Sequence, residues 1–215
     1  MPKAVGRLHV LTDQALQRRF SHLELARLAI LGGADVIQFR QKGGSTRQMI
    51  ETASAMRRLC EEMGAVLIVN DRLDVALAAK AHGAHLGQDD FPLPLARELL
   101  GPGAILGGSA SSLEEARQCL AQGADYVGFG PVFATTSKDD AGPASGLGLL
   151  ARVVQEIPLP VVAIGGIGPL NAPQVMATGV HGLAVISAVC CQEDPRAATQ
   201  ALRQAMASPA GGGHA

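Results

Sequence analysis

Short apolar runs recur along the whole chain, and longer segments rich in Ala, Leu, Glu and Arg lie between them. The runs are continuous rather than alternating between apolar and polar residues, which is typical of parallel strands buried on both faces. This repetition constrains the fold more than any other feature of the sequence. The predicted strands are Leu8–Leu11, Val36–Phe39, Val66–Val69, Ala84–Leu86, Ala104–Leu106, Tyr126–Phe129, Val161–Ile164 and Gly182–Ile186.

The segments between the runs have the composition of helices, and the junctions between helix and strand also repeat. The stretches "GGADVIQF", "HGAHLG", "QGADYVGFG" and "TGVHGLAVI" each end a helix at Gly and begin a strand within a few residues. The helices predicted from these patterns include Leu23–Leu31, Thr46–Met63, Asp74–Ala81, Leu113–Ala121, Pro173–Thr178 and Pro195–Met206.

Repeated strand–helix units without a break in composition predict a single α/β domain, a (β/α)8 TIM barrel over residues 1–207. The last residues, "SPAGGGHA" at 208–215, are predicted to form a flexible tail. The alternative is an open, doubly wound sheet, which usually carries a G-x-G-x-x-G turn before its first helix. The first unit here, "HVLTDQALQRRF", has no such turn, so the barrel is favoured.

The composition argues against nucleic acid and membranes as partners. Aromatic residues make up 3% of the chain and the net charge is −1, so neither stacking platforms nor a strong positive field is expected. No apolar run approaches the roughly 18 residues of a membrane span, and "MPKAVGRLHVLTD" lacks the pattern of a signal peptide. The four cysteines form no C-x-x-C pair, which favours reduced thiols in a cytoplasmic protein. The sequence leaves a homo-oligomer open.

Polar residues follow most of the predicted strands. In (β/α)8 barrels the carboxyl ends of the strands carry the active site, so we expect these side chains to gather in one mouth. They are Thr12 and Asp13 after the first strand, Gln38, Arg40 and Lys42 in and after the second, Asn70 and Asp71 after the third, Gln88, Asp89 and Asp90 after the fourth, Ser109 after the fifth and Ser187 after the eighth.

Asp71 and Asp90 follow neighbouring strands and should therefore face each other. Two carboxylates in one mouth repel unless a cation or a proton lies between them, and Mg²⁺ with its preference for oxygen ligands is the natural guest. The alternative is that Asp71 caps the helix beginning near Leu73 and that Asp90 caps the turn before Pro92. The spacing alone leaves both interpretations open.

Arg40, Lys42 and Lys138 add positive charge beside the predicted metal, which indicates a polyphosphate ligand that binds both. Each alone could be a solvated loop residue. The segment "ATTSKDDAGPASG" after the sixth strand is long for a connection, which suggests a binding loop or lid.

The stretches "AIGGIGP" and "AVISA" follow the last two strands, where many barrels bind a monophosphate. Close packing of strand and helix would equally account for the glycines there. The residues thus indicate two anionic sites in one mouth, and hence an enzyme that joins or rearranges two phosphorylated small molecules.

A family resemblance agrees with this interpretation. The motifs "LTD", "QFRQK", "VNDRLDVALA", "GAHLGQDD", "GGSASSLEEA", "GADYVGFGPVFATTSK", "VVAIGGI" and "GLAVISA" occur in order over nearly the whole chain. Together they resemble the thiamine phosphate synthase (thiamine-phosphate pyrophosphorylase) family. The resemblance implies a (β/α)8 barrel that uses Mg²⁺ to join hydroxymethylpyrimidine pyrophosphate to thiazole phosphate. In that family pyrophosphate is thought to leave first, and the thiazole nitrogen then captures the pyrimidine carbocation.

The resemblance also implies roles for individual residues. Asp71 and Asp90 would bind Mg²⁺, and Ser109 would reach the pyrimidine. Arg40, Lys42, Lys138 and Ser109 would be the catalytic residues. The pyrophosphate would be held by Gln38, Arg40, Lys42, Asn70 and Lys138, and the thiazole phosphate by Thr135, Ser137, Gly166 and Ser187. Ile186 would be a further substrate-binding residue.

The chain departs from the common family pattern in three places. Gln41 stands where many relatives have Glu, Ala134 replaces a usual Pro in the loop after the sixth strand, and Ser137 replaces a common Thr. The related thiazole tautomerases share the barrel but usually lack the second metal Asp and use a His near the fifth strand. Here Asp90 is present and "GGSASS" contains no His, so the tautomerase is the second interpretation. A phosphate-ligand sensor without catalytic activity is the third.

Overall fold

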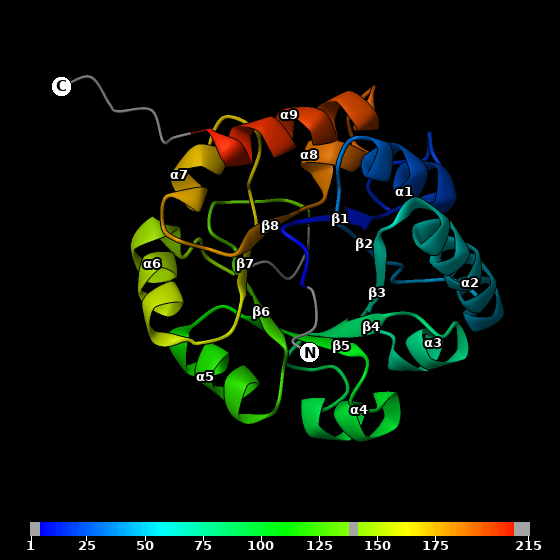
Figure 1. Cartoon of the computed structure of the whole chain (residues 1–215), viewed down its shortest axis with the longest axis horizontal. Coiled ribbons are helices and arrows are strands. Elements are labelled where there is room, and N and C mark those ends of the chain that lie inside the picture. The colour runs from blue at the N-terminus through cyan, green and yellow to red at the C-terminus, as the bar shows by residue number, and fades with distance from the viewer. Residues whose placement is uncertain (1–4, 138–141, 209–215) are drawn as a thin grey trace.

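The chain forms a closed barrel of parallel strands in a computed structural model that describes residues 5–137 and 142–208. Each strand pairs with the next along the chain, and the last pairs with the first, so the sheet has no free edge. Figure 1 shows the ring of strands inside a ring of helices. The strands are β1 (Leu8–Thr12), β2 (Val36–Phe39), β3 (Val66–Asn70), β4 (Gly83–Leu86), β5 (Ile105–Ala110), β6 (Tyr126–Phe129), β7 (Val161–Ile164) and β8 (Gly182–Val185).

A helix follows each strand, and one further helix closes the ring beside the first (Figure 1). The predicted (β/α)8 barrel is therefore confirmed. The helices are α1 (His22–Leu31), α2 (Thr46–Met63), α3 (Leu73–Ala78), α4 (Leu93–Leu100), α5 (Leu113–Ala121), α6 (Gly146–Glu156), α7 (Ala172–Met176), α8 (Ser187–Cys190) and α9 (Pro195–Ala207).

Among the described helices, α1, α5 and α9 begin at a residue whose side chain caps the helix. At α1, the Ser21 hydroxyl accepts from the N–H of Glu24, and the Glu24 carboxylate accepts from the N–H of Ser21, which forms a capping box. At α9, the Asp194 carboxylate accepts from the N–H of Ala197. Such caps are each worth about 1 kcal/mol, and they set where these helices begin.

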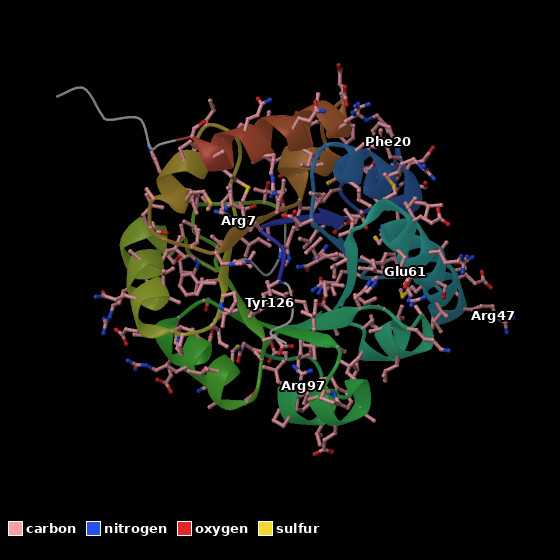
Figure 2. All side chains as sticks on the ribbon, viewed as in Figure 1. Arg7, Phe20, Arg47, Glu61, Arg97 and Tyr126 are labelled. Carbon is pink, nitrogen blue, oxygen red and sulfur yellow. The ribbon has the colours of Figure 1, made fainter. Side chains whose placement is uncertain are left out.

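The apolar core has two parts, as expected for a barrel with helices outside it. One part lies between strands and helices and contains most of the buried Ala, Val, Leu and Ile. The other part includes Leu11, Tyr126, Val162 and Ala184, one residue from each of four strands. Figure 2 shows Tyr126 within the ring of strands. Gln38, Asn70 and His85 share the interior of the barrel with Tyr126, around a small cavity.

The largest difference from the sequence-based boundaries concerns β5. The strand was expected at 104–106, but it extends to Ala110 through two glycines. Glycine is unfavourable in an isolated strand, yet Gly107 and Gly108 lie where larger neighbours on both faces leave no room for a side chain. The helices α4, α6 and α8 were not assigned from the sequence, and α3 ends three residues earlier than expected, at Ala78.

Two predictions fall on residues that the structure does not describe. Lys138 lies outside the described residues, and so does the predicted tail apart from its first residue, Ser208. Within the described ranges, no helix has both the length and the apolar character needed to cross a membrane. The thiols of Cys60, Cys119, Cys190 and Cys191 are free.

Candidate active site

A cavity of about 1060 Å³ opens at the carboxyl ends of the strands. This is the end at which barrel enzymes carry their chemistry. The cavity brings together nine of the residues that the sequence analysis singled out as site residues. These are Lys42, Asp71, Asp90, Ser109, Thr135, Ser137, Gly166, Ile186 and Ser187.

Asp71 occupies one side of this mouth in an unusual backbone conformation. Its φ is 65°, a left-handed value that non-glycine residues seldom adopt. The Asp71 N–H donates to the carbonyl of His85 over 2.9 Å, which extends the pairing of β3 with β4. The Asp71 carboxylate lies 2.8 Å from the Lys42 ammonium. Backbone strain of this kind is concentrated at functional sites, and here it directs a carboxylate into the mouth.

Asp90 lies beside Asp71, and the two carboxylates affect each other. Burial raises the pKa of Asp90, and the adjacent Asp71 carboxylate raises this pKa further. The N–H of Gly87, which donates to the Asp90 carboxylate over 2.6 Å, and the ammonium of Lys42 act in the opposite direction. The mouth therefore contains a close pair of carboxylates, as the positions of the two residues after neighbouring strands predicted.

The capping alternative is wrong for Asp71, and part of it is confirmed for Asp90. The N-cap of α3 is Arg72 and has no side-chain cap hydrogen bond, so Asp71 does not cap this helix. Asp90 closes the turn after β4 by accepting a hydrogen bond from the N–H of Gly87, which is part of what the alternative expected.

The Asp71 and Asp90 carboxylates suit a hard divalent cation that completes its shell with water or ligand oxygens. Among residues 5–137 and 142–208 no group of three or more His, Cys, Asp and Glu could hold a metal by itself.

Arg40, Gln38 and Asn70 lie deeper than predicted and do not line the mouth cavity. Arg40 forms a buried ion pair with Asp13, and its Nε has no partner in the described part of the chain. Gln38 and Asn70 line a small cavity of about 20 Å³ inside the barrel, which also reaches Ser109. The Asn70 Oδ1 is buried and accepts no hydrogen bond from a described residue. That these three residues bind substrate stays a prediction.

The opposite side of the mouth is rich in hydroxyl and backbone groups. The Ser137 hydroxyl, from the loop after β6, donates to the Ser187 hydroxyl at the start of α8 over 3.0 Å. Gly166, after β7, has a φ of 65°, and a Cβ there would lie 2.7 Å from both Ala134 O and Phe133 Cβ. Only glycine suits this position, because a side chain would collide with the loop after β6.

Asn171 holds the loop that contains Gly166, a role that the sequence analysis missed. The Asn171 Oδ1 accepts from the N–H of Gly168 over 2.8 Å, and its Nδ2 donates to the carbonyl of Gly166 over 2.9 Å. Asp13 was expected in the mouth from its place directly after the first strand, but its ion pair with Arg40 was not predicted.

These features define the class of protein, a (β/α)8 barrel with a small-molecule site at its strand ends. A family model described as thiamine monophosphate synthase matches residues 8–189, and the chain belongs to this family.

Two curated relatives and one solved structure illustrate the similarity. The chain is 53% identical over 196 residues to a thiamine-phosphate synthase of Methanocella arvoryzae, covering 91% of this chain and 92% of the relative. It is 50% identical over 204 residues to the thiamine-phosphate synthase of Salinibacter ruber, covering 95% and 90%. A solved structure of thiamine phosphate pyrophosphorylase from Pyrococcus furiosus is 44% identical, with a TM-score of 0.85 and coverage of 94% of this chain and 95% of that one.

Proposed function

We propose that this chain is a thiamine phosphate synthase that joins hydroxymethylpyrimidine pyrophosphate to thiazole phosphate and releases pyrophosphate. One observation carries the proposal: a single mouth contains Lys42 and a carboxylate pair on one side and the Ser137–Ser187 hydroxyl pair on the other. The names of the relatives support the same reaction, since they are thiamine-phosphate synthases of similar length.

The proposed reaction forms one bond and breaks one. The bond between the pyrimidine methylene carbon and the pyrophosphate oxygen breaks, and its electron pair leaves with pyrophosphate. The lone pair of the thiazole nitrogen then forms the new C–N bond with the same methylene carbon. No protein nucleophile is required, so the residues act by orienting the two substrates and by stabilising the leaving charge.

In this proposal Asp71 and Asp90 hold Mg²⁺. The pKa of Asp90 is raised by burial and by the adjacent Asp71 carboxylate, and a cation between the two carboxylates would offset both effects. Bound Mg²⁺ supplies positive charge to the oxygens of the leaving pyrophosphate. Lys42 contacts the Asp71 carboxylate in the structure and would turn to the pyrophosphate when it binds. Lys138, from the loop after β6, and Arg40, which Asp13 holds in a buried ion pair, are proposed to bind the same group.

The other half of the proposed site binds thiazole phosphate. The hydroxyls of Thr135, Ser137 and Ser187 and the backbone around Gly166 offer hydrogen bonds to a monophosphate without adding a fixed charge. Ser109 lies between the two halves and is proposed to contact the pyrimidine ring. We further propose that the protein acts in the cytoplasm, which its free thiols favour.

An assay with omitted substrates tests the proposal. The protein is incubated with Mg²⁺ and the pyrimidine pyrophosphate alone, the thiazole phosphate alone, or both, and the products are identified by mass. We expect thiamine phosphate only when both substrates are present. Conversion of a thiazole carboxylate phosphate without the pyrimidine would instead assign the chain to the tautomerases. Binding of the substrates without any product would assign it a sensor role.

A further inference from the structure

A chain of hydrogen-bonded side chains crosses the interior of the barrel and ends at Ser109. The Gln38 Nε2 lies 3.1 Å from His9 Nδ1 and 3.4 Å from the Tyr126 hydroxyl. The Tyr126 hydroxyl lies 2.9 Å from His85 Nδ1, and His85 Nε2 lies 2.9 Å from the Ser109 hydroxyl. These side chains come from five different strands, so the hydrogen bonds connect five strands of the barrel to one residue of the mouth, Ser109.

The direction of the hydrogen bonds is fixed at the inner end of this chain. His9 Nε2 lies 2.9 Å from the carbonyl oxygen of Gly6, which can only accept, so this nitrogen must carry a proton. Burial lowers the pKa of His9 to about 4, so the ring is neutral at neutral pH and its Nδ1 is an acceptor. The Gln38 amide nitrogen must therefore donate to His9 Nδ1, and its second hydrogen is directed to Tyr126.

The same direction continues to the mouth. Burial raises the pKa of Tyr126, so its hydroxyl keeps the single proton and, because it accepts from Gln38, donates this proton to His85 Nδ1. An imidazole that accepts at Nδ1 carries its hydrogen on Nε2. His85 Nε2 therefore donates to the Ser109 hydroxyl oxygen. Within the described part of the chain this is the one hydrogen bond of the Ser109 hydroxyl, so its own hydrogen is left for a ligand in the mouth.

The sequence leaves space for this arrangement by placing glycines beside it. His85 on β4 and Tyr126 on β6 are both in register with Gly107 of β5, which lies between them. A Cβ on Gly107 would overlap the Tyr126 ring and His85 Nδ1, and a Cβ on Gly128 would lie 2.7 Å from His85 Cε1. The two glycines thus allow His85 and Tyr126 to meet across β5.

We propose that this chain of hydrogen bonds makes Ser109 a dedicated donor to the pyrimidine substrate, with Tyr126 and His85 as positioning residues. A free serine hydroxyl can donate or accept, whereas a serine that already accepts from His85 is set to donate. The ligand atom that faces Ser109 must then be an acceptor, an unprotonated ring nitrogen rather than an exocyclic amino group. This inference rests on the proposed function, because it takes the pyrimidine to be the ligand at Ser109.

The tautomer of His85 tests the proposal without any substrate. Long-range ¹H–¹⁵N spectra of the full chain at neutral pH should show His85 with an unprotonated Nδ1 and a protonated Nε2, assigned by loss of its signals in His85→Gln. In Tyr126→Phe, which removes only the hydroxyl, the two tautomers should become mixed. A wild-type His85 that is protonated at Nδ1 would overturn the proposal, even if the chain proved to be the proposed enzyme.

Substrate analogues test the consequence at Ser109. The natural pyrimidine pyrophosphate is compared with two analogues. In each analogue a different ring nitrogen of the pyrimidine is replaced by C–H. The analogue that lacks the ring nitrogen facing Ser109 should bind wild type roughly threefold to tenfold more weakly than the natural compound, the usual effect of one hydrogen bond. This difference should vanish in Ser109→Ala. Equal binding of the natural ring and both analogues to wild type would overturn the donor role. Failure of all three compounds to bind, with the tautomer as expected, would reject the proposed function instead.

Steady-state kinetics of His85 and Tyr126 variants distinguishes a positioning role of these residues from a role in packing alone. His85→Gln keeps an acceptor toward Tyr126 and a donor toward Ser109, whereas His85→Leu removes both. We expect Tyr126→Phe and His85→Leu to raise the KM for the pyrimidine pyrophosphate by roughly threefold to tenfold, and the thiazole phosphate KM to stay unchanged. His85→Gln should restore the wild-type value. Equal changes in both KM values, or no rescue by Gln, would identify these residues as structural only, with thermal unfolding as the check on folding.

Discussion

The Ser137 hydroxyl donates to the Ser187 hydroxyl over 3.0 Å and so joins the loop after β6 to the start of α8. The two residues are far apart in sequence, and this bond brings the two loops of the proposed monophosphate site into contact. Because Ser187 is exposed, the contact contributes little to stability and is available to a ligand.

Replacing Ser187 by Ala should therefore affect one substrate only. We expect the KM for thiazole phosphate to rise roughly tenfold, since a hydrogen bond to a charged phosphate is lost, while the KM for the pyrimidine pyrophosphate stays near wild type. Steady-state kinetics with each substrate varied in turn measures both values. A rise in the pyrimidine KM alone would mean that the two halves of the mouth are assigned the wrong way round.

Asp71→Asn separates charge from backbone strain. Asn tolerates a positive φ better than most residues, so the turn at 71 should persist and the free energy of unfolding should change by less than about 1 kcal/mol. Loss of the carboxylate should lower kcat by at least about a hundredfold, because charge on the leaving pyrophosphate loses its stabilisation. Asp89→Asn is the matched control, as this exposed carboxylate also lines the mouth. If Asp89→Asn lost as much activity as Asp71→Asn, the role assigned to Asp71 would be wrong.

The fold itself is tested at Gly107. An Ala there places a methyl group against Tyr126 and His85 in the closed interior, so Gly107→Ala should destabilise the protein by about 1–3 kcal/mol. Gly103→Ala is the control, because a Cβ at that position meets nothing within 4 Å. Urea denaturation of both variants measures the difference. Equal stability of the two would show that the interior is less tightly packed than the structure indicates.

Buried histidine should make the protein sensitive to acid. Burial lowers the pKa of His22 to about 4, although the nearby Asp13 opposes this shift. An unfolded histidine titrates near 6.5, so the unfolded state binds more protons below that pH, and stability should fall as the pH drops from about 6.5 to 4. The loss from this one residue is up to about 3 kcal/mol.

His22→Gln should remove that part of the pH dependence. Unfolding free energies of wild type and variant, measured from pH 8 to pH 4, should run parallel above pH 6.5 and diverge below it, with the variant less sensitive to acid. Curves that stay parallel down to pH 4 would show that His22 is not held neutral by the fold.

The sequence predicted the barrel and much of the mouth because both depend on local patterns. Continuous apolar runs identify buried parallel strands, and the polar residue after each run lies at the carboxyl end by necessity. Asp71 and Asp90 therefore meet as expected. The extent of β5 could not be predicted, because Gly107 and Gly108 are in a strand for the sake of their neighbours and not through their own preference.

Contacts between side chains of different strands could not be predicted from the sequence. Arg40 was expected in the mouth, but the structure buries it in an ion pair with Asp13, a contact between the ends of two different strands. The link from Gln38 through Tyr126 to His85 likewise depends on the stagger of strands that are distant in sequence. Residue types and spacing can identify candidates for a site, but only the closed sheet determines their partners.

Pyrophosphate release measured against product formation is the most direct test of the proposed reaction. With both substrates and Mg²⁺ present, we expect one pyrophosphate released for each thiamine phosphate formed, at a rate that falls by at least about a hundredfold with excess chelator or in Asp71→Asn. Turnover that continues undiminished in chelator, or product formed without pyrophosphate, would contradict it.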